Sequence, residues 1–402
     1  MPENKDNKIL NVPNLRFPEF EGEWEESTIG KQFELYSGNT PSRINKELFN
    51  GTINWISSGE LKEHYIYSTK ERISQEAANN LKLLSVGTFV IAIYGLEAEG
   101  VRGTGSITQE PSTISQACMA FTPKGEITNE FLYSWYKKHG NVIGVKYAQG
   151  TKQQNLSYDI LEKFKISYPN VKEQDKLNLF FSLIDKRIST QNKVIEDLKK
   201  LKCAIIDYTI ETLQTDYIEF SEVYDMAGEG GTPSTSNMEY YENGCIPFVK
   251  IEDLKQKYLV SNKDHITELG LQKSSAWLIP TNSILFSNGA TIGEISITTY
   301  PVCTKQGILG IVPKVNFDTE YLYYLMSSRY FKREICRIIT EGTMKTAYLK
   351  DINKIRCPIP SKAIQQEIVS LPSVLNTKIE IEQRILEKFI CQKQYLFRQM
   401  FI

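Results

Sequence analysis

The chain has 402 residues, of which 41% are hydrophobic and 24% charged, and its formal net charge at pH 7 is −1. These values are typical of a globular protein and exclude a disordered or fibrous chain, and the length favours two or three domains. A near-neutral chain is poorly suited to bind nucleic acid by itself, unless its 47 Lys and Arg residues gather on one face or partner subunits help to neutralise the phosphates.

The cysteines and histidines form no metal-binding pattern. The seven cysteines include no C-x-x-C pair and the chain has three histidines, which argues against a zinc site. An odd, unpatterned set of thiols fits a reducing compartment. Residues 1–15 lack the apolar core of a secretory signal, and no segment approaches the roughly 18 apolar residues of a membrane span. We therefore expect a cytoplasmic protein without membrane contact.

The chain contains an internal duplication. Gly-Asn-Thr-Pro-Ser at residues 38–42 recurs as Gly-Gly-Thr-Pro-Ser at residues 230–234, and further matches follow in the same order through each half. Among them, Gln116 matches Gln306. A repeat that spans half the chain indicates two similar domains rather than a solenoid, whose repeats have periods of about 20–50 residues.

In chain order, an N-terminal extension at residues 1–19 precedes a first domain at residues 20–168. Within it, residues 86–94 are rich in β-branched and aromatic side chains and predict a buried strand, which a Gly-rich turn follows. Many short strands with one or two helices predict a mixed α/β domain. A long helix is expected at residues 169–214, because Pro and Gly are absent from 173–212.

The second half repeats this order. A second domain is expected at residues 215–360, with a buried strand at 282–287 and a Gly-rich turn at 288–293, and a second long helix at 361–402. Pro372 lies within that helical run and predicts either a kink or a later start of the helix.

Both long helices carry an apolar stripe at helical spacing, with charged residues on the other face. In the first helix the stripe consists of Leu177, Phe181, Ile184, Ile188, Ile195, Leu198 and Ile205. In the second it consists of Ile364, Ile368, Leu371, Leu375, Ile379, Leu386, Phe389, Leu396 and Met400. The pattern favours pairing of the two helices as an antiparallel coiled coil, and the alternative is that each helix packs on its own domain.

The sequence contains no recognisable enzyme signature. There is no Walker A motif, no Pro-Pro pair of the kind found in the tetrapeptide of adenine methyltransferases, and no His/Cys/Ser arrangement that would supply a nucleophile and its base. Residues 60–62, Glu-Leu-Lys, match the end of a nuclease motif, but no Asp lies between Asp6 and Glu60, and the repeat partner at 253–255 fits a structural turn equally well. The sequence therefore predicts a binding protein that is not an enzyme.

Over its whole length the chain resembles the specificity subunits of type I restriction–modification systems. The resemblance is carried by the Gly-x-Thr-Pro-Ser opening of each half, the Gly-Thr turns at Gly150 and Gly342, and the exits at Pro169 and Pro360, each before a Gln-containing helix start. The second helix start departs from the first, because it lacks an acidic residue equivalent to Glu173.

The resemblance implies two target-recognition domains, each reading one half of a bipartite sequence in double-stranded DNA, and a coiled coil that fixes the gap between the half-sites. It also implies that two methyltransferase subunits dock on the coiled coil and that motor-nuclease subunits bind through them. No cofactor is expected on this chain, whereas S-adenosylmethionine, ATP and Mg²⁺ are expected on the partner subunits.

Base edges are read by polar side chains, and phosphate contacts set the register. In the first domain the candidates for such contacts are Thr40, Ser42, Arg43, Ser57, Ser58, Lys62, Arg102, Gln116, Lys152 and Gln153. In the second they are Thr232, Ser234, Lys250, Lys255, Asn288, Lys305, Gln306, Thr343 and Lys345. A role in shaping turns is the alternative for the Ser and Thr residues. Because residues 55–58 and 248–251 differ between the copies, we expect the two domains to read different bases.

One reading from another functional class remains open. A bivalent protein-binding scaffold without DNA specificity would also present two repeated domains on paired helices. A mobility-shift assay with the methyltransferase subunit present separates the two readings.

Overall fold

The computed structural model describes residues 10–96, 100–148, 155–289, 291–339 and 346–402. By its internal contacts the chain divides into unit 1, Met1–Thr190 with Ile385–Ile402, and unit 2, Gln191–Arg384. The boundaries fall inside two long helices, α5 (Val171–Thr212) and α10 (Lys362–Met400). Each unit therefore contains one globular domain and a part of both helices.

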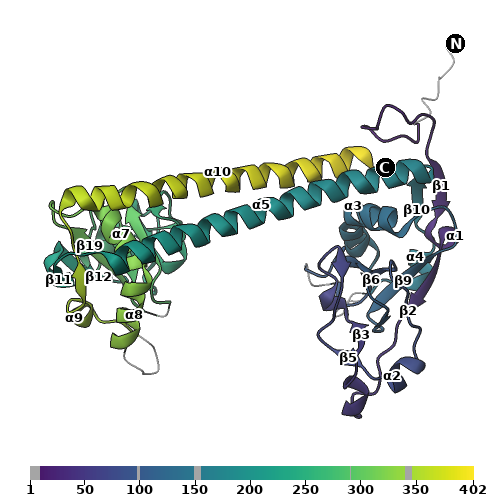
Figure 1. The fold of residues 1–402 in the computed structure, drawn as a ribbon, viewed down its shortest axis with the longest axis horizontal. Coiled ribbons are helices and arrows are strands. Elements are labelled where there is room, and N and C mark those ends of the chain that lie inside the picture. The colour runs from purple at the N-terminus through teal and green to yellow at the C-terminus, as the bar shows by residue number, and fades with distance from the viewer. Residues whose placement is uncertain (1–9, 97–99, 149–154, 290, 340–345) are drawn as a thin grey trace. The chain divides into compact units, whose positions relative to one another are not determined.

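The globular part of unit 1 is a mixed α/β domain (Figure 1). Its strands are β1 (Glu25–Thr28), β2 (Phe33–Ser37), β3 (Ile53–Ile56), β4 (Tyr65–Ile66), β5 (Arg72–Ile73), β6 (Phe89–Ala92), β7 (Gly105–Thr108), β8 (Ser112–Ile114), β9 (Cys118–Pro123) and β10 (Lys165–Tyr168). Its helices before α5 are α1 (Ile29–Gln32), α2 (Gln75–Asn79), α3 (Asn129–Tyr147) and α4 (Tyr158–Leu161). The strands form a five-stranded sheet in the order β2-β9-β6-β7-β4, a three-stranded sheet in the order β5-β3-β8, and the pair β1-β10.

Strand β6 lies at the centre of the five-stranded sheet and falls within residues 86–94, where the sequence predicts a buried strand. It is antiparallel to both β9 and β7, and all four of its residues are buried. Phe89 and Ile91 belong to the core that includes α3, whereas Val90 and Ala92 belong to a second core with Ile56 of β3. Both faces of β6 are thus covered, which explains why its sequence shows no alternation of apolar and polar residues.

Unit 2 repeats this topology strand by strand. Its strands are β11 (Tyr217–Glu219), β12 (Tyr224–Glu229), β13 (Ile246–Val249), β14 (Tyr258–Leu259), β15 (Asp264–Ile266), β16 (Ile284–Ser287), β17 (Ile295–Thr298), β18 (Cys303–Thr304), β19 (Ile308–Pro313) and β20 (Arg356–Pro358). Its helices between α5 and α10 are α6 (Glu268–Gln272), α7 (Thr319–Ser327), α8 (Arg329–Ile338) and α9 (Leu349–Ile352). The sheets have the orders β12-β19-β16-β17-β14, β15-β13-β18 and β11-β20. The predicted duplication and mixed α/β class are therefore confirmed.

The long helices α5 and α10 run antiparallel within each unit (Figure 1). In unit 1 the Phe181 and Phe397 rings stack with centroids 4.1 Å apart, and Arg187 lies over the Phe389 ring. In unit 2 the Gln191 side chain donates to the Glu382 backbone oxygen at 3.1 Å. Lys202 donates to Asn376 Oδ1 at 3.0 Å, so higher numbers on α5 meet lower numbers on α10.

Most residues of the predicted stripes are buried or half-buried, and some of them pack against the globular core of their own unit. Buried or half-buried positions are Leu177, Phe181, Ile184, Ile188, Ile195, Leu198, Ile205, Ile368, Leu375, Ile379, Leu386, Phe389, Leu396 and Met400. Ile364 and Leu371 share the same spacing but lie on the outside of α10, 44% and 51% exposed. The apolar stripe of α10 is therefore wider than the part of it that is buried, and its outer residues remain exposed.

Pro372 does not mark the start of the second helix, because α10 begins at Lys362 and continues through the proline. The Pro372 ring is buried, and Val369 one turn before it packs into the core of unit 2. Packing of the helix on both sides of the proline offsets the backbone hydrogen bond that its missing N–H removes.

A buried glutamine joins each long helix to its globular domain. Gln174 accepts from the Thr128 backbone N at 2.9 Å and donates to the carbonyls of Pro169 and Glu126 at 2.9 and 3.1 Å. Gln365 accepts from the Asp318 backbone N at 2.8 Å and donates to the Pro360 carbonyl at 2.8 Å. Since Thr128 and Asp318 are the N-caps of α3 and α7, the same side-chain bridge is built twice.

Glu173 is the acidic residue that the start of the second long helix lacks, and in unit 1 it pairs with Arg16. Glu173, 1% exposed, accepts two hydrogen bonds from the Arg16 guanidinium, at 2.8 and 2.7 Å, and one from Trp24 Nε1 at 3.3 Å. Arg16 belongs to the N-terminal segment. The equivalent position in unit 2 is Ile364, which is 44% exposed and carries no charge.

Candidate nucleic-acid interface

Three loops meet in each unit because two strands of the three-stranded sheet are parallel. Ile56 at the end of β3 is paired with Ile114 at the end of β8, and Val249 of β13 is paired with Thr304 of β18. The carboxyl ends of parallel strands lie at the same edge of a sheet. The residues that follow these strands, including Ser57 and Gln116 in unit 1 and Lys250 and Lys305 in unit 2, are therefore brought together.

The glycine of the Gly-x-Thr-Pro-Ser motif brings the third loop against this edge. A Cβ atom on Gly38 would overlap the backbone carbonyl of Ile114, and a Cβ on Gly230 would overlap the carbonyl of Thr304. The Asn39 backbone N donates to Ile114 O at 3.0 Å. Only glycine allows the motif loop to approach the strand end this closely.

In each unit the threonine of the Gly-x-Thr-Pro-Ser motif contacts a glutamine, and these two glutamines, Gln116 and Gln306, match each other in the repeat. In unit 1 the Thr40 hydroxyl donates to Gln116 Oε1. In unit 2 the Gln306 backbone N donates to Thr232 Oγ1 at 3.3 Å. We call the two groups of converging loops reading cluster 1 (Thr40, Ser57, Gln116) and reading cluster 2 (Thr232, Lys250, Lys305, Gln306).

Reading cluster 2 lines a cleft of about 490 Å³. The residues around it are Glu229, Thr232, Lys250, Ile251, Glu252, Gly289, Lys305, Gln306, Gly307 and Thr346. Four of the candidates from the sequence are thus neighbours in space. Lysine ammonium and glutamine amide groups donate hydrogen bonds, and carboxylates accept them, so the cleft can contact both acceptors and donors on base edges.

The charges in this cleft are partly fixed by the protein itself. Lys250 Nζ lies 2.9 Å from Asp264 Oδ2, and this hydrogen bond and the carboxylate charge raise the pKa of Lys250. Glu229 Oε1 accepts from the Gly307 backbone N at 3.0 Å. Lys305 and Gln306 are exposed. In the part of the chain that the structure describes, the Lys305 ammonium has no ion-pair partner, so it is available to a ligand.

The same turn carries different side chains in the two clusters. Ser57 donates from both its backbone N and its hydroxyl to Glu60 Oε2, at 3.0 and 2.9 Å. The Lys250 backbone N donates to Asp253 Oδ2 at 2.9 Å, while its long side chain extends to Asp264. The capping carboxylate is therefore common scaffold. The Ser57 hydroxyl is occupied by the cap, whereas Lys250 presents a cation.

The remaining exposed candidates lie outside the two clusters. Arg43 forms a two-pronged ion pair with Glu71, at 2.8 and 2.9 Å, and lies over the rings of Phe49 and Trp55. The hydrogen bond from Arg43 lowers the pKa of Glu71. Lys255 lines a different cleft in unit 2, and Lys62 is exposed.

The serine candidates Ser42 and Ser234 are exposed and Ser58 is half-buried; the Ser234 hydroxyl lies 2.8 Å from that of Ser236. This contact fits a turn-shaping role for Ser234.

Two candidates, Asn288 and Arg102, donate hydrogen bonds to backbone carbonyls of their own unit. Asn288 is 1% exposed and its Nδ2 donates to the Ala347 carbonyl at 3.2 Å, so it ties the turn after β16 to the chain just before α9 and is not available at the surface. Arg102 Nε donates to the Leu96 carbonyl at 2.5 Å, and its stem packs against Gly144 of α3. Lys152, Gln153, Thr343 and Lys345 lie outside the described residues.

Sequence reasoning missed the acidic members of the site. Glu229 precedes Gly230 directly and is a neighbour of the motif in sequence, which is a signal that could have been used. Asp264 lies on β15, and only the pairing of β15 with β13 brings it to Lys250. Among the described residues no group of three His, Cys, Asp or Glu side chains is placed to hold a metal ion.

A family model described as the type I restriction modification DNA specificity domain matches the chain twice, at residues 21–200 and 215–389. The chain belongs to this family. The family consists of the non-catalytic specificity subunits of type I restriction–modification systems. Within the described ranges, no helix is both long and apolar enough to cross a membrane.

Relatives cover nearly the whole chain. The specificity subunit of the type I restriction enzyme MjaIX from Methanocaldococcus jannaschii is 24% identical over 390 residues, which covers 90% of this chain and 89% of that protein. The EcoR124I/EcoR124II specificity subunit of Escherichia coli is 26% identical over 284 residues, covering 66% of this chain and 68% of that protein.

Solved structures share the fold. The type I system S subunit from M. genitalium superposes with a TM-score of 0.55 at 17% identity, covering 97% of this chain and 99% of that chain. A chain from a study of complex assembly in the type I system superposes with a TM-score of 0.64 at 15% identity, covering 94% and 96%.

Proposed function

We propose that this specificity subunit reads a bipartite DNA target, one half-site with each globular domain, and docks two methyltransferase subunits on its paired helices. The observation that carries the proposal is the duplicated reading cluster. Both clusters rest on the same glycine, the same parallel strand ends and the same carboxylate cap, but they present different side chains to solvent. A common scaffold with different contact residues suits two readers of unlike half-sites.

The charge of the chain supports shared binding of DNA. The chain has 47 basic and 48 acidic residues, and phosphate contacts supply much of the affinity of DNA-binding proteins. A near-neutral reader therefore needs partner subunits that neutralise phosphates. In this proposal the partners also hold the cofactors: S-adenosylmethionine on the methyltransferase subunits, and ATP with Mg²⁺ on motor-nuclease subunits that bind through them.

An uncovered apolar face on the long helices supports the docking of partners. On α5 in unit 2, Val194, Leu201 and Tyr208 recur every seven residues and are 39%, 49% and 71% exposed. On α10 in unit 2 the exposed apolar residues are Ile364, Leu371, Val374 and Ile381. We call these seven residues the outer stripe. Apolar residues at heptad spacing on a helix suit a further helix that packs against them.

The DNA-reading proposal is tested by determining which sequence motif is methylated in a cell that expresses the chain together with its partner subunits. Methylome sequencing is expected to return two specific half-sites separated by unspecified bases. A Lys305→Ala variant is expected to alter or weaken only one half-site, and Lys273→Ala, an exposed lysine outside reading cluster 2, is the matched control. A continuous motif, or a change in both half-sites caused by Lys305→Ala, contradicts the proposal.

Co-purification tests the docking. Leu201→Asp is expected to weaken binding of the methyltransferase subunits, while Asn192→Asp places the same charge on the same helix at an exposed position on the opposite face from the outer stripe. Equal binding by the two variants would argue that the outer stripe is not the docking surface.

A further inference from the structure

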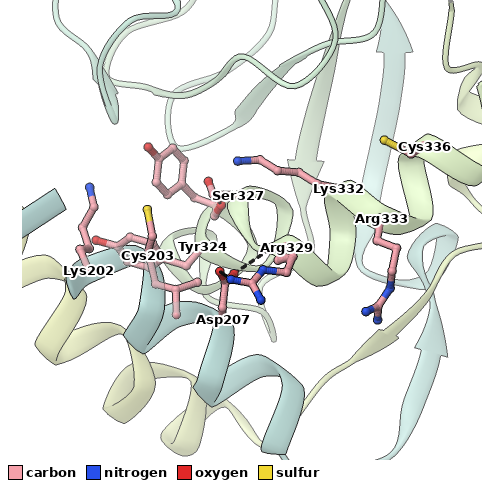
Figure 2. A pocket seen from close by; sticks show the side chains of 11 residues that line it. Lys202, Cys203, Asp207, Tyr324, Ser327, Arg329, Lys332, Arg333 and Cys336 are labelled. Atoms are coloured by element: carbon pink, nitrogen blue, oxygen red, sulfur yellow. Dashed lines mark hydrogen bonds and ion pairs between the residues drawn. The ribbon is translucent and has the colours of Figure 1, made fainter. Parts of the chain in front are cut away.

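A pocket of about 500 Å³ in unit 2 has no role in the reading cluster (Figure 2). Three helices form it: α5 supplies Lys202, Cys203, Ile206 and Asp207, α7 supplies Tyr323, Tyr324 and Ser327, and α8 supplies Arg329, Lys332, Arg333 and Cys336. We call it the α5–α8 pocket. It joins a helix of the docking surface to the globular domain.

The walls of the α5–α8 pocket are apolar and aromatic. Ile206 and Tyr324 are 6% and 2% exposed. Tyr323 is half-buried, and its ring stands edge-on to that of Tyr324 with centroids 5.3 Å apart. An apolar group that enters this space removes hydrocarbon surface from water on both sides, which favours binding.

The rim of the pocket carries an excess of positive charge. Among the described residues that line the pocket, Asp207 is the only carboxylate. It accepts from the Arg329 backbone N at 2.7 Å and lies 3.5 Å from the Arg329 guanidinium, so it already has its partners. Lys202 donates to a neutral group, Asn376 Oδ1, and burial lowers the pKa of Lys202. Lys332 is exposed.

Lys332 is the cation that a ligand can reach. Figure 2 shows its side chain extending from α8 toward the α5 side of the pocket, whereas Arg333 points away. Across the residues that the structure describes, the Lys332 ammonium has neither a carboxylate partner nor a hydrogen-bond acceptor, while Arg333 lies 3.8 Å from Glu334. Apolar walls with an unpaired ammonium at the rim call for an occupant that is apolar inside and anionic outside.

This chemistry favours a protein segment over a nucleic-acid backbone. A sugar–phosphate chain would contact the ammonium but leave the walls formed by Ile206 and the tyrosines without an apolar partner. The exposed side chains of Leu201 and Tyr208 flank the pocket-lining residues on α5, so the apolar outer stripe is continuous in sequence with the pocket. A segment that packs on the outer stripe can therefore insert a side chain here.

We propose that the α5–α8 pocket anchors a segment of the methyltransferase subunit in which a large apolar side chain is followed by one or more carboxylates. This proposal rests on the docking function proposed above and adds the site and chemistry of one contact. The apolar side chain fills the space between α5 and α7, and a carboxylate pairs with Lys332.

Two native cysteines report on the occupancy of the pocket. Cys203 and Cys336 line it and are exposed free thiols, while Cys245 is an exposed free thiol of unit 2 outside it. The experiment measures the rate of iodoacetamide alkylation at each thiol by mass spectrometry, for the full chain alone, for its complex with methyltransferase subunits, and for the chain with DNA. We expect alkylation of Cys203 and Cys336 to slow about tenfold or more in the protein complex without DNA, and alkylation of Cys245 to be unchanged.

The outcomes separate this proposal from the one on which it rests. Formation of a complex without protection of Cys203 and Cys336 overturns the pocket proposal and leaves the docking function standing. Protection that requires DNA assigns the pocket to a nucleic acid and also overturns it. Failure to form any complex overturns both proposals.

Charge reversal supplies a second measurement. Lys332→Glu is expected to weaken binding of the methyltransferase subunits about tenfold, because it places a carboxylate opposite a carboxylate. Lys332→Arg should retain binding, and Lys273→Glu, with the same charge change outside the pocket, should leave it unchanged. Binding by Lys332→Glu equal to that by Lys273→Glu refutes the role of Lys332.

Discussion

The buried glutamine at the start of each long helix is expected to stabilise its unit, and for Gln365 the adjacent Gln366 provides a matched control. In the Gln365→Ala variant, the Asp318 backbone N and the Pro360 carbonyl lose the partners that now lie 2.8 Å from Gln365. A buried polar group left without a partner costs about 1–3 kcal/mol. Two such groups predict a loss of about 2–6 kcal/mol in the free energy of unfolding of unit 2. Gln366 is exposed, so Gln366→Ala should change stability by less than about 0.5 kcal/mol.

Scanning calorimetry of the full chain measures the difference. For a unit of this size, a loss of about 2–6 kcal/mol corresponds to a fall in Tm of about 4–24 °C. The unit 1 counterpart Gln174 makes an additional bond, to the Glu126 carbonyl, so Gln174→Ala should be at least as destabilising. If Gln365→Ala and Gln366→Ala melted within about 1 °C of each other, the view that the glutamine joins helix to domain would be wrong.

Three further predictions address the reading clusters and pH. Replacing residues 20–168 with the corresponding domain of another family member should change one half of the methylated motif, and a change in both halves would refute the modular reading. Gly230→Ala should destabilise unit 2 by about 1–3 kcal/mol, because the added methyl group overlaps the Thr304 carbonyl, and urea unfolding beside Gly289→Ala, which has more space, measures this. Burial raises the pKa of Glu320, but hydrogen bonds from Lys257, Ser373 and Tyr258 outweigh it and lower that pKa from its ordinary 4.5. The Glu320 carboxylate therefore stabilises unit 2 above about pH 4.5, and this stabilisation is lost as the pH falls through the lowered pKa. Glu320→Gln should therefore flatten the acid side of the stability profile, and an unchanged profile would contradict the assignment.

The sequence by itself determined the duplication, the class of each domain and the long helices. These are properties of local pattern. An unbroken apolar run predicts a strand covered on both faces, as in β6, and apolar residues at helical spacing without Pro or Gly predict a helix. The helices begin and end within two residues of the expected ranges. The sequence also identified Gly38 and Gly230 as the start of a repeated motif, but not the reason for glycine there.

Tertiary structure decided which polar residues meet. Lys250 and Lys305 are far apart in sequence and are brought together by the parallel pairing of β13 with β18, a contact that no local pattern encodes. Asn288 and Lys305 look equally suitable as loop residues, yet one side chain turns inward to bind a carbonyl and the other faces solvent.

The same holds for the apolar residues of α10. Ile364 and Ile379 share one periodic stripe, but the partner helix covers only part of it. Spacing specifies that a face is apolar, whereas what packs against that face depends on the rest of the fold.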